Sequence, residues 1–106
     1  MNDLAWSTTE ESIAKSALKT AYDREIDALM TEVRHQVEEI EHIGDLWRLH
    51  DFLSARRHDV DGKYDDDLES ILFGFARLVK EGWLKMTDLD GLTKEKLAKI
   101  GALARM

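Results

Sequence analysis

Cysteine and proline are absent from this chain of 106 residues, and glycine occurs only six times. Without cysteine, neither a disulfide nor a thiolate metal site can form, so we expect a soluble protein of the reducing cytoplasm. Long apolar runs are also lacking, and the first six residues have neither a basic start nor an apolar core. We therefore expect no signal peptide and no integral membrane segment.

The residues that are abundant favour helix throughout. Ala, Leu, Glu, Lys and Arg lose little side-chain freedom on a helix, and we expect no strand. Hydrophobic residues make up 43% of the chain, charged residues make up 35%, and the formal net charge is −7. These values predict one acidic all-α domain over residues 1–106, with an extended helix at about 7–43 and a helical head at about 45–106.

A long apolar stripe defines the first helix. Residues 7–10 have the pattern of a capping box, and apolar residues then recur every three or four positions with no breaker until Gly44. The stripe consists of Leu18, Tyr22, Ile26, Leu29, Met30, Val33, Val37 and Ile40. A helix over about 7–43 is about 50 Å long, whereas a compact domain of this size is only about 35 Å across.

Such a helix must project from the domain, and its apolar side then needs a cover. A second copy of the chain is the simplest cover, because the stripe fits the seam positions of a helical bundle. We predict a homodimer whose interface includes Leu29, Met30, Val33 and Val37. The alternative is that the chain's own later helices cover the stripe completely.

Shorter helices are expected downstream. Asp45 should cap a helix from Leu46 to about His58, and a turn at 59–64 should end it. A further helix should begin at the acids of 65–67 and stop at Gly82, where a left-handed residue is expected. A last short helix completes the head.

Negative charge is concentrated at the start of the chain. Residues 1–45 hold eleven acids and four bases, whereas residues 46–106 hold eleven of each. A helix with this excess repels a phosphate backbone, and the sequence contains no basic stripe or nucleic-acid motif. We therefore expect no nucleic-acid partner.

One side of the expected second helix carries polar and aromatic residues instead of leucines. At spacings of three, four and seven, this strip consists of Trp47, His50, Asp51, Ser54, Arg57 and His58. Tryptophan and arginine often dominate the energy of protein interfaces, so the strip indicates a binding surface. The alternative is that Trp47 belongs to the core and the polar groups form surface ion pairs.

No catalytic or metal site is expected. His50 and Asp51 are neighbours whose side chains should diverge on a helix, and Ser54 lacks a glycine loop that would hold an oxyanion. The histidines lie two turns apart, too far for one ion. The aspartates around Gly62 do not fit a calcium loop, because the alignment places Leu68 at the last ligand position. We therefore expect neither an enzyme nor a bound cofactor or metal.

An aromatic residue is expected on the outer face of the third helix. At about 100° per residue, Phe73 lies opposite the buried side centred on Phe75, and beside Arg77 and Lys80. The last segment adds the bases Lys94, Lys96, Lys99 and Arg105. An exposed ring among bases suits an acidic protein partner. The alternative is that the last helix or Trp83 covers Phe73.

The chain closely resembles the fluorescence recovery proteins of cyanobacteria over residues 45–58, DLWRLHDFLSARRH, and over 61–65, DGKYD. The likeness extends more loosely to AYDREI at 21–26, LVKEG at 78–82 and LAKIGALAR at 97–105. It therefore covers nearly the whole chain.

The resemblance implies a non-enzymatic regulator. Proteins of this family are all-helical dimers that bind the photoactivated orange carotenoid protein, mainly at its C-terminal domain. They speed its return to the orange form and its detachment from the phycobilisome, which ends photoprotective quenching. The implied location is cytoplasmic, with peripheral contact at the thylakoid membrane. The alternative is an adaptor homodimer of the same fold that binds a different protein.

The resemblance also implies roles for particular positions. The matching residues are Trp47, His50, Asp51 and Arg57 in the family's functional cluster, Phe73 and Lys99 in its partner-binding head, and Leu46 and Trp47 at or near its dimer interface. We therefore expect two groups of partner-binding residues, one on the second helix and one on the head.

Overall fold

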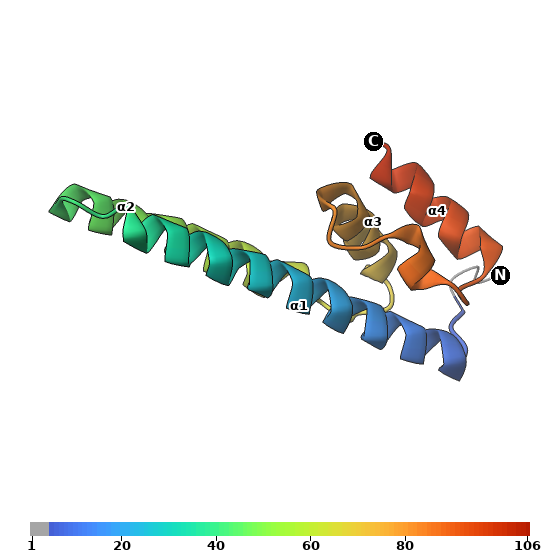
Figure 1. Cartoon of the computed structure of the whole chain (residues 1–106). Coiled ribbons are helices and arrows are strands. Elements are labelled where there is room, and N and C mark those ends of the chain that lie inside the picture. Colours follow the sequence, from blue (N-terminus) through green and yellow to red (C-terminus); the bar gives the residue numbers. More distant parts are fainter. Residues whose placement is uncertain (1–4) are drawn as a thin grey trace.

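The computed structural model describes residues 5–106, and its helices form a rod and a head (Figure 1). The elements are α1 (Thr8–Glu38), α2 (Ile43–Lys63), α3 (Ile71–Glu81), the 3₁₀ turn η1 (Met86–Leu89) and α4 (Lys94–Ala104). Over these described residues, the only strand-like pairing is a single bridge between Asp90 and Leu92. The prediction of an all-α fold is confirmed.

Helix α1 begins where the sequence predicts but ends earlier. Ser7 is the N-cap: its Oγ accepts the N–H of Glu10 at 3.1 Å, and its own N–H donates to the Glu10 carboxylate at 3.2 Å. The helix ends at Glu38, and Gly44 lies in the first turn of α2 instead of stopping α1. The run of acids around Glu38 lies at the negative end of the helix dipole, which disfavours further turns.

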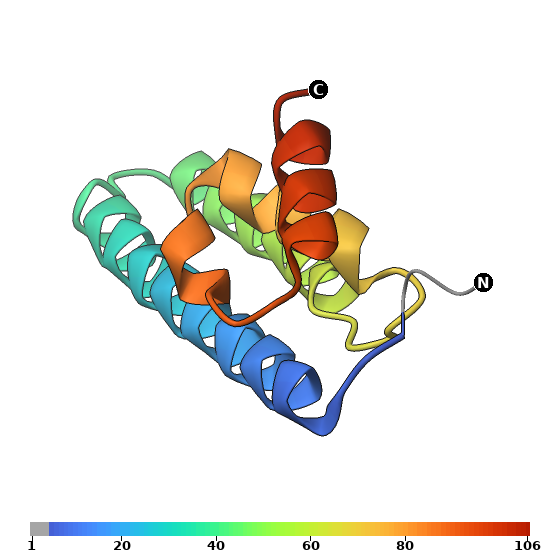
Figure 2. The same ribbon diagram turned by 90° about the vertical axis from the view of Figure 1, so that its right-hand side faces the viewer.

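Helix α2 is longer than predicted. It spans Ile43–Lys63 instead of Leu46 to about His58, and it continues through Gly62. Asp45 caps the helix from inside the first turn, because its carboxylate accepts two backbone N–H groups at 3.1 Å. The chain then folds back, so that α2 lies along α1 and the two helices form the rod (Figures 1 and 2). Helix α2 is therefore part of the rod, and the prediction that it belongs to a head at about 45–106 is wrong for this helix.

The head packs on the first half of α1. Its fully buried side chains come from α3, η1 and α4 and include Ile71, Phe75, Leu78, Leu89 and Ile100. Helix α1 contributes Ala14, Ala17, Leu18 and Ala21 to the same core. Gly82 adopts the left-handed conformation, with φ of 88°, and ends α3 as predicted. The apolar core therefore lies at one end of the molecule.

The molecule is elongated, with dimensions of 59 × 24 × 21 Å. Its radius of gyration is 16.8 Å, whereas a compact domain of this length has about 13 Å. Between residues 26 and 59, only Leu49 is buried. Helices owe most of their stability in water to packing of an apolar face. A single chain does not provide that packing for this part of the rod.

Gly74 lies within α3 and provides a test of helix stability. A Cβ at this position meets no atom within 4 Å. Gly74→Ala is therefore expected to raise the free energy of unfolding by about 0.5–1 kcal/mol, because alanine loses less backbone freedom on folding. Urea denaturation followed by circular dichroism measures this change. Gly91→Ala is the opposite control, because Gly91 has φ of 106° and a Cβ there collides with Ile13; equal effects of the two substitutions would contradict this account.

Candidate functional site

The rod exposes several large apolar side chains, here together called the rod face. Its members are Tyr22, Met30, Val37, Ile43, Leu46, Trp47 and Leu53. Met30 is 49% exposed, Val37 51% and Trp47 58%, while Leu29 and Val33 are half-buried. The alternative that the chain's own helices cover the stripe completely is therefore wrong. Large apolar side chains exposed in this number along two helices favour an interaction surface.

The polar strip on α2 is exposed along its whole length. The rings of Trp47 and His50 meet edge to face, with centroids 6.4 Å apart, and the indole is not part of a core. His50 Nδ1 lies 3.3 Å from Asp51 Oδ1, so the prediction that these two side chains diverge is wrong. The side chains of His50 and Asp51 are 72% and 82% exposed, so no packed element keeps these two sequence neighbours apart. Arg57 is 86% exposed and lies 3.8 Å from Asp61.

The head exposes an aromatic ring beside bases. Phe73 is 58% exposed on α3. An open hollow of about 380 Å³, here called the Phe73 groove, is lined by Phe73, Ala76, Arg77, Lys80, Leu103 and Met106. The ring therefore faces solvent, as its spacing predicts, and neither the last helix nor Trp83 covers it. Lys99 is exposed on α4, the helix that packs against α3.

The two exposed groups lie on different parts of the molecule. Trp47 is in the first turns of α2 at the far end of the rod, whereas Phe73 is on the head (Figure 1). The structure brings Trp47 together with His50 and Asp51, and it brings Phe73 together with bases. A partner that contacts both groups of one chain must extend along the rod.

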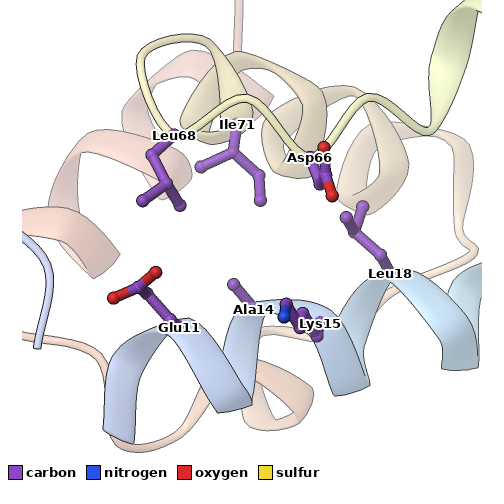
Figure 3. A pocket seen from close by; sticks show the side chains of 7 residues that line it. All are labelled: Glu11, Ala14, Lys15, Leu18, Asp66, Leu68 and Ile71. Carbon is purple, nitrogen blue, oxygen red and sulfur yellow. The ribbon is translucent and has the colours of Figure 1, made fainter. Parts of the chain in front are cut away.

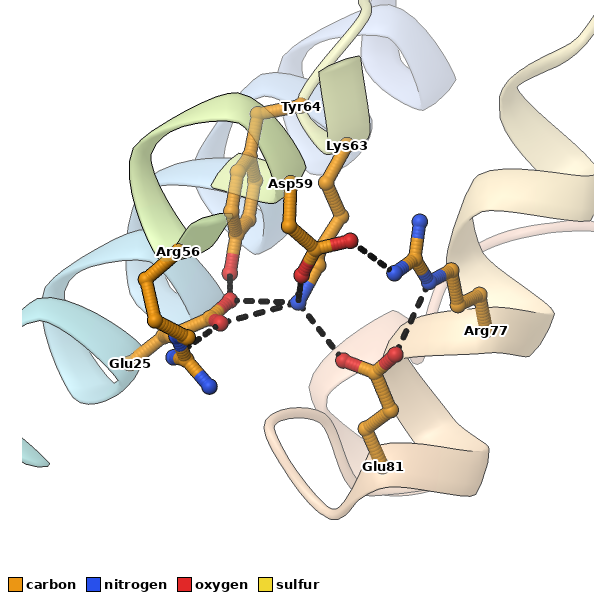
Figure 4. Close-up of polar contacts among 7 residues, drawn as sticks. All are labelled: Glu25, Arg56, Asp59, Lys63, Tyr64, Arg77 and Glu81. Carbon is orange, nitrogen blue, oxygen red and sulfur yellow. Dashed lines mark hydrogen bonds and ion pairs between the residues drawn. The ribbon is translucent and has the colours of Figure 1, made fainter. Parts of the chain in front are cut away.

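A buried carboxylate that was not among the predicted site residues joins the rod to the head. Glu25 of α1 is 0% exposed. Its carboxylate accepts hydrogen bonds from Lys63 at 2.8 and 3.0 Å, from Arg56 at 2.8 Å and from the Tyr64 hydroxyl at 2.6 Å (Figure 4). Lys63 also donates to Glu81 of α3 at 2.7 Å. Helices α1, α2 and α3 therefore meet at one ionic network.

Asp59 and Glu81 of this network are ionised at neutral pH. Burial opposes the ionisation of Glu81, but hydrogen bonds from Lys63 and Arg77 outweigh it and hold the pKa of its carboxyl below the ordinary value. The hydrogen bond from Arg77 likewise lowers the pKa of Asp59. Burial and its hydrogen bond in the network raise the pKa of Tyr64, which remains a donor. The stability from both carboxylates is present above the ordinary carboxyl pKa and is lost as acid protonates them.

A second buried ion pair holds the first turn of α1, and the residues just before it, against α4. The Lys96 side chain is 2% exposed, and its ammonium donates to both carboxylate oxygens of Glu10 at 3.0 Å and to the Ala5 carbonyl at 2.6 Å. It also lies 4.6 Å from the centre of the Trp6 ring. The prediction that Lys96 adds to an exposed basic surface is therefore wrong.

A smaller hollow of about 200 Å³ lies between the first turns of α1 and the segment before α3 (Figure 3). It is lined by Glu11, Ala14, Lys15, Leu18, Asp66, Leu68 and Ile71.

Across residues 5–106, no group of three His, Cys, Asp or Glu side chains is placed to hold a metal ion. None of the helices in that range combines the length and the apolar character needed to cross a bilayer.

Comparison with known proteins places these features in a family. Residues 6–104 match the family described as photoprotection regulator fluorescence recovery protein. The chain is 48% identical to the fluorescence recovery protein of Synechocystis sp. PCC 6803 over 101 residues, which are 95% of this chain and 93% of that protein. Solved structures of the Synechocystis and Fremyella diplosiphon proteins are 48% and 49% identical. Each has a TM-score of 0.93 and covers 96% of this chain and 100% of its own.

Proposed function

Because the chain belongs to the fluorescence recovery protein family of photoprotection regulators, we propose that it binds the photoactivated orange carotenoid protein. In this proposal it speeds the return of that protein to the orange form and its detachment from the phycobilisome. The family match over residues 6–104 carries the proposal. The proposed location is the cytoplasm, with peripheral contact at the thylakoid membrane.

The proposed role requires binding alone and no catalytic chemistry. A protein that only binds accelerates a conformational change when it binds the transition state or the compact product better than the open form. Equal affinity for all forms changes neither rate nor population. We assign Phe73 and Lys99 on the head to contact with the C-terminal domain of the carotenoid protein, because both are exposed.

A second group of contacts is assigned to the strip on α2. Its members in this proposal are Trp47, His50, Asp51 and Arg57. The indole offers a large rigid contact area, and the guanidinium of Arg57 is exposed enough to bind a carboxylate of the partner.

We further propose that two chains pair through their rods. The exposed rod face supports this pairing, because between residues 26 and 59 one chain buries only Leu49. A second rod adds the missing layer of a helical bundle. The proposed interface comprises Leu29, Met30, Val33, Val37, Leu46 and Trp47. Two heads on one dimer can contact separated parts of a partner and raise their effective concentration.

The proposed function is tested by the dark decay of the red form. The purified chain is mixed with photoactivated orange carotenoid protein, and the return of the orange absorption spectrum is followed after the light is switched off. We expect acceleration that increases with the concentration of the chain and saturates. A decay equal to the spontaneous rate would contradict the proposal and favour an adaptor dimer with a different protein partner.

Phe73→Asp is expected to weaken binding of the carotenoid protein by at least about tenfold. The substitution removes an apolar contact and adds an acid beside bases that we expect to face an acidic partner. The affinity is measured by titrating the variant into the carotenoid protein, which continuous light keeps in its photoactivated form. Phe73→Leu is the control and should retain most of the binding. Loss of helicity in Phe73→Asp would show instead that the ring supports the fold.

A further inference from the structure

Arg77 belongs to two features of the structure at once. It lines the Phe73 groove beside Lys80. Its Nη2 donates to Asp59 Oδ1 on α2, and its Nε donates to Glu81 Oε2 at 2.8 Å. The groove on the head and the end of the rod are therefore joined through one side chain.

These contacts close into a ring of four alternating charges, here called the charge ring (Figure 4). The ring consists of Asp59, Arg77, Glu81 and Lys63. Lys63 Nζ lies 2.7 Å from Glu81 Oε1 and 3.3 Å from Asp59 Oδ2. Each carboxylate thus contacts two cations. Asp59 therefore has a second counter-ion, Lys63, besides Arg77.

The link between α2 and the head is mainly polar. As far as residues 5–106 show, no residue of α2 belongs to the apolar core of the head. The side chains of Arg77 and Asp59 are 45% and 36% exposed, so solvent reaches the pair. Ion pairs of this kind contribute little net stability, because water and solutes compete with them. A second carboxylate can therefore replace Asp59 at Arg77 at little cost.

We propose that Arg77 is the receptor for a carboxylate of the protein that docks at the Phe73 groove, and that this carboxylate displaces Asp59. The inference rests on the proposed function, because it requires a protein partner at Phe73. In the complex, Arg77 keeps Glu81 and binds the partner, while Asp59 stays with Lys63. No buried charge loses its counter-ion, and docking loosens the link between α2 and α3.

Asp59→Asn and Arg77→Gln test this exchange, because it predicts effects of opposite sign. The partner is the orange carotenoid protein, kept in the red form by continuous light. Asp59→Asn removes the competitor and should tighten binding about two- to fivefold. Arg77→Gln should weaken binding about tenfold, and the double variant should match Arg77→Gln alone. Weaker binding by both single variants would show a purely structural ring and overturn the proposal.

A matched control and a replacement variant accompany this test. Asp23→Asn removes an exposed acid that pairs with Lys19 outside the ring, and it should leave binding unchanged. If Arg77→Gln does not fold, Arg77→Lys replaces it, since lysine cannot hold two carboxylates in a fork.

If the carotenoid protein does not bind the unmodified chain, the proposed function fails, and the exchange is decided with acetate as the probe. The Arg77 Nε–H resonance is followed by NMR while acetate is added. Asp59→Asn should then bind acetate more tightly than the unmodified chain does. Equal acetate affinities would overturn the proposal.

Discussion

Glu25→Gln is expected to lower the free energy of unfolding by about 3–5 kcal/mol. Glu25 is fully buried and accepts hydrogen bonds from Arg56, Lys63 and Tyr64. The amide carries no charge, and its NH₂ group replaces one acceptor oxygen with a donor. Lys63, with a side chain 2% exposed, then loses its buried counter-ion. Urea denaturation at neutral pH and fixed protein concentration measures the loss.

An exposed ion pair provides the control for this prediction. Lys19 and Asp23 lie on the same helix 2.7 Å apart, with side chains 76% and 58% exposed. Asp23→Asn is expected to change the free energy of unfolding by less than about 0.5 kcal/mol. If Glu25→Gln cost no more than this control, the network would not be a structural link between rod and head.

Leu46→Glu is expected to raise the dissociation constant of the proposed dimer by more than about a hundredfold. Leu46 lies on the rod face and is 43% exposed in the single chain. In a two-fold dimer the substitution introduces a charge into the interface from both copies. Sedimentation equilibrium measures the constant, and circular dichroism should show unchanged helicity.

Phe73→Asp is the matched control for Leu46→Glu. It also places an acid at an exposed apolar position, but on the head instead of the rod face. It should leave the dimer intact. Equal dissociation of both variants, or of neither, would contradict the assignment of the rod face to the dimer interface.

The long helix α1 was predictable because it depends on local pattern, whereas the pairing of α2 with it was not. A stripe at spacings of three and four, with a capping box at Ser7, is enough to predict the start and the projection of α1. The end of α1 was not predictable in the same way, because the first glycine after the stripe is Gly44 and the chain has no proline. A glycine is tolerated in a helix at a cost of about 1 kcal/mol. Both Gly44 and Gly62 are tolerated in this way, since they lie inside α2.

The outward position of Phe73 was predictable for the same reason. The angle of about 100° per residue places it opposite Phe75 without knowledge of the tertiary structure. The exposure of Trp47 was an open alternative, because tryptophan is usually largely buried. The position of α2 along the rod decides that Trp47 is exposed, since the head does not cover that part of the helix.

The ionic networks were not predictable from local pattern. Glu25 meets Arg56 and Lys63 only because α2 folds back along α1. One signal was nevertheless present: Leu18, Ala21 and Glu25 follow the spacing of a single helical face. A carboxylate on an apolar face indicates a buried counter-ion, but the sequence does not say which base supplies it.

The mass of the unmodified chain in solution tests the central claim most directly. The rod face is exposed in one chain, and we infer that a second chain covers it. Light scattering after gel filtration at micromolar concentration and physiological salt should give twice the 12.2 kDa of one chain. A mass of one chain across that concentration range would contradict the account, because the rod would then remain uncovered in water.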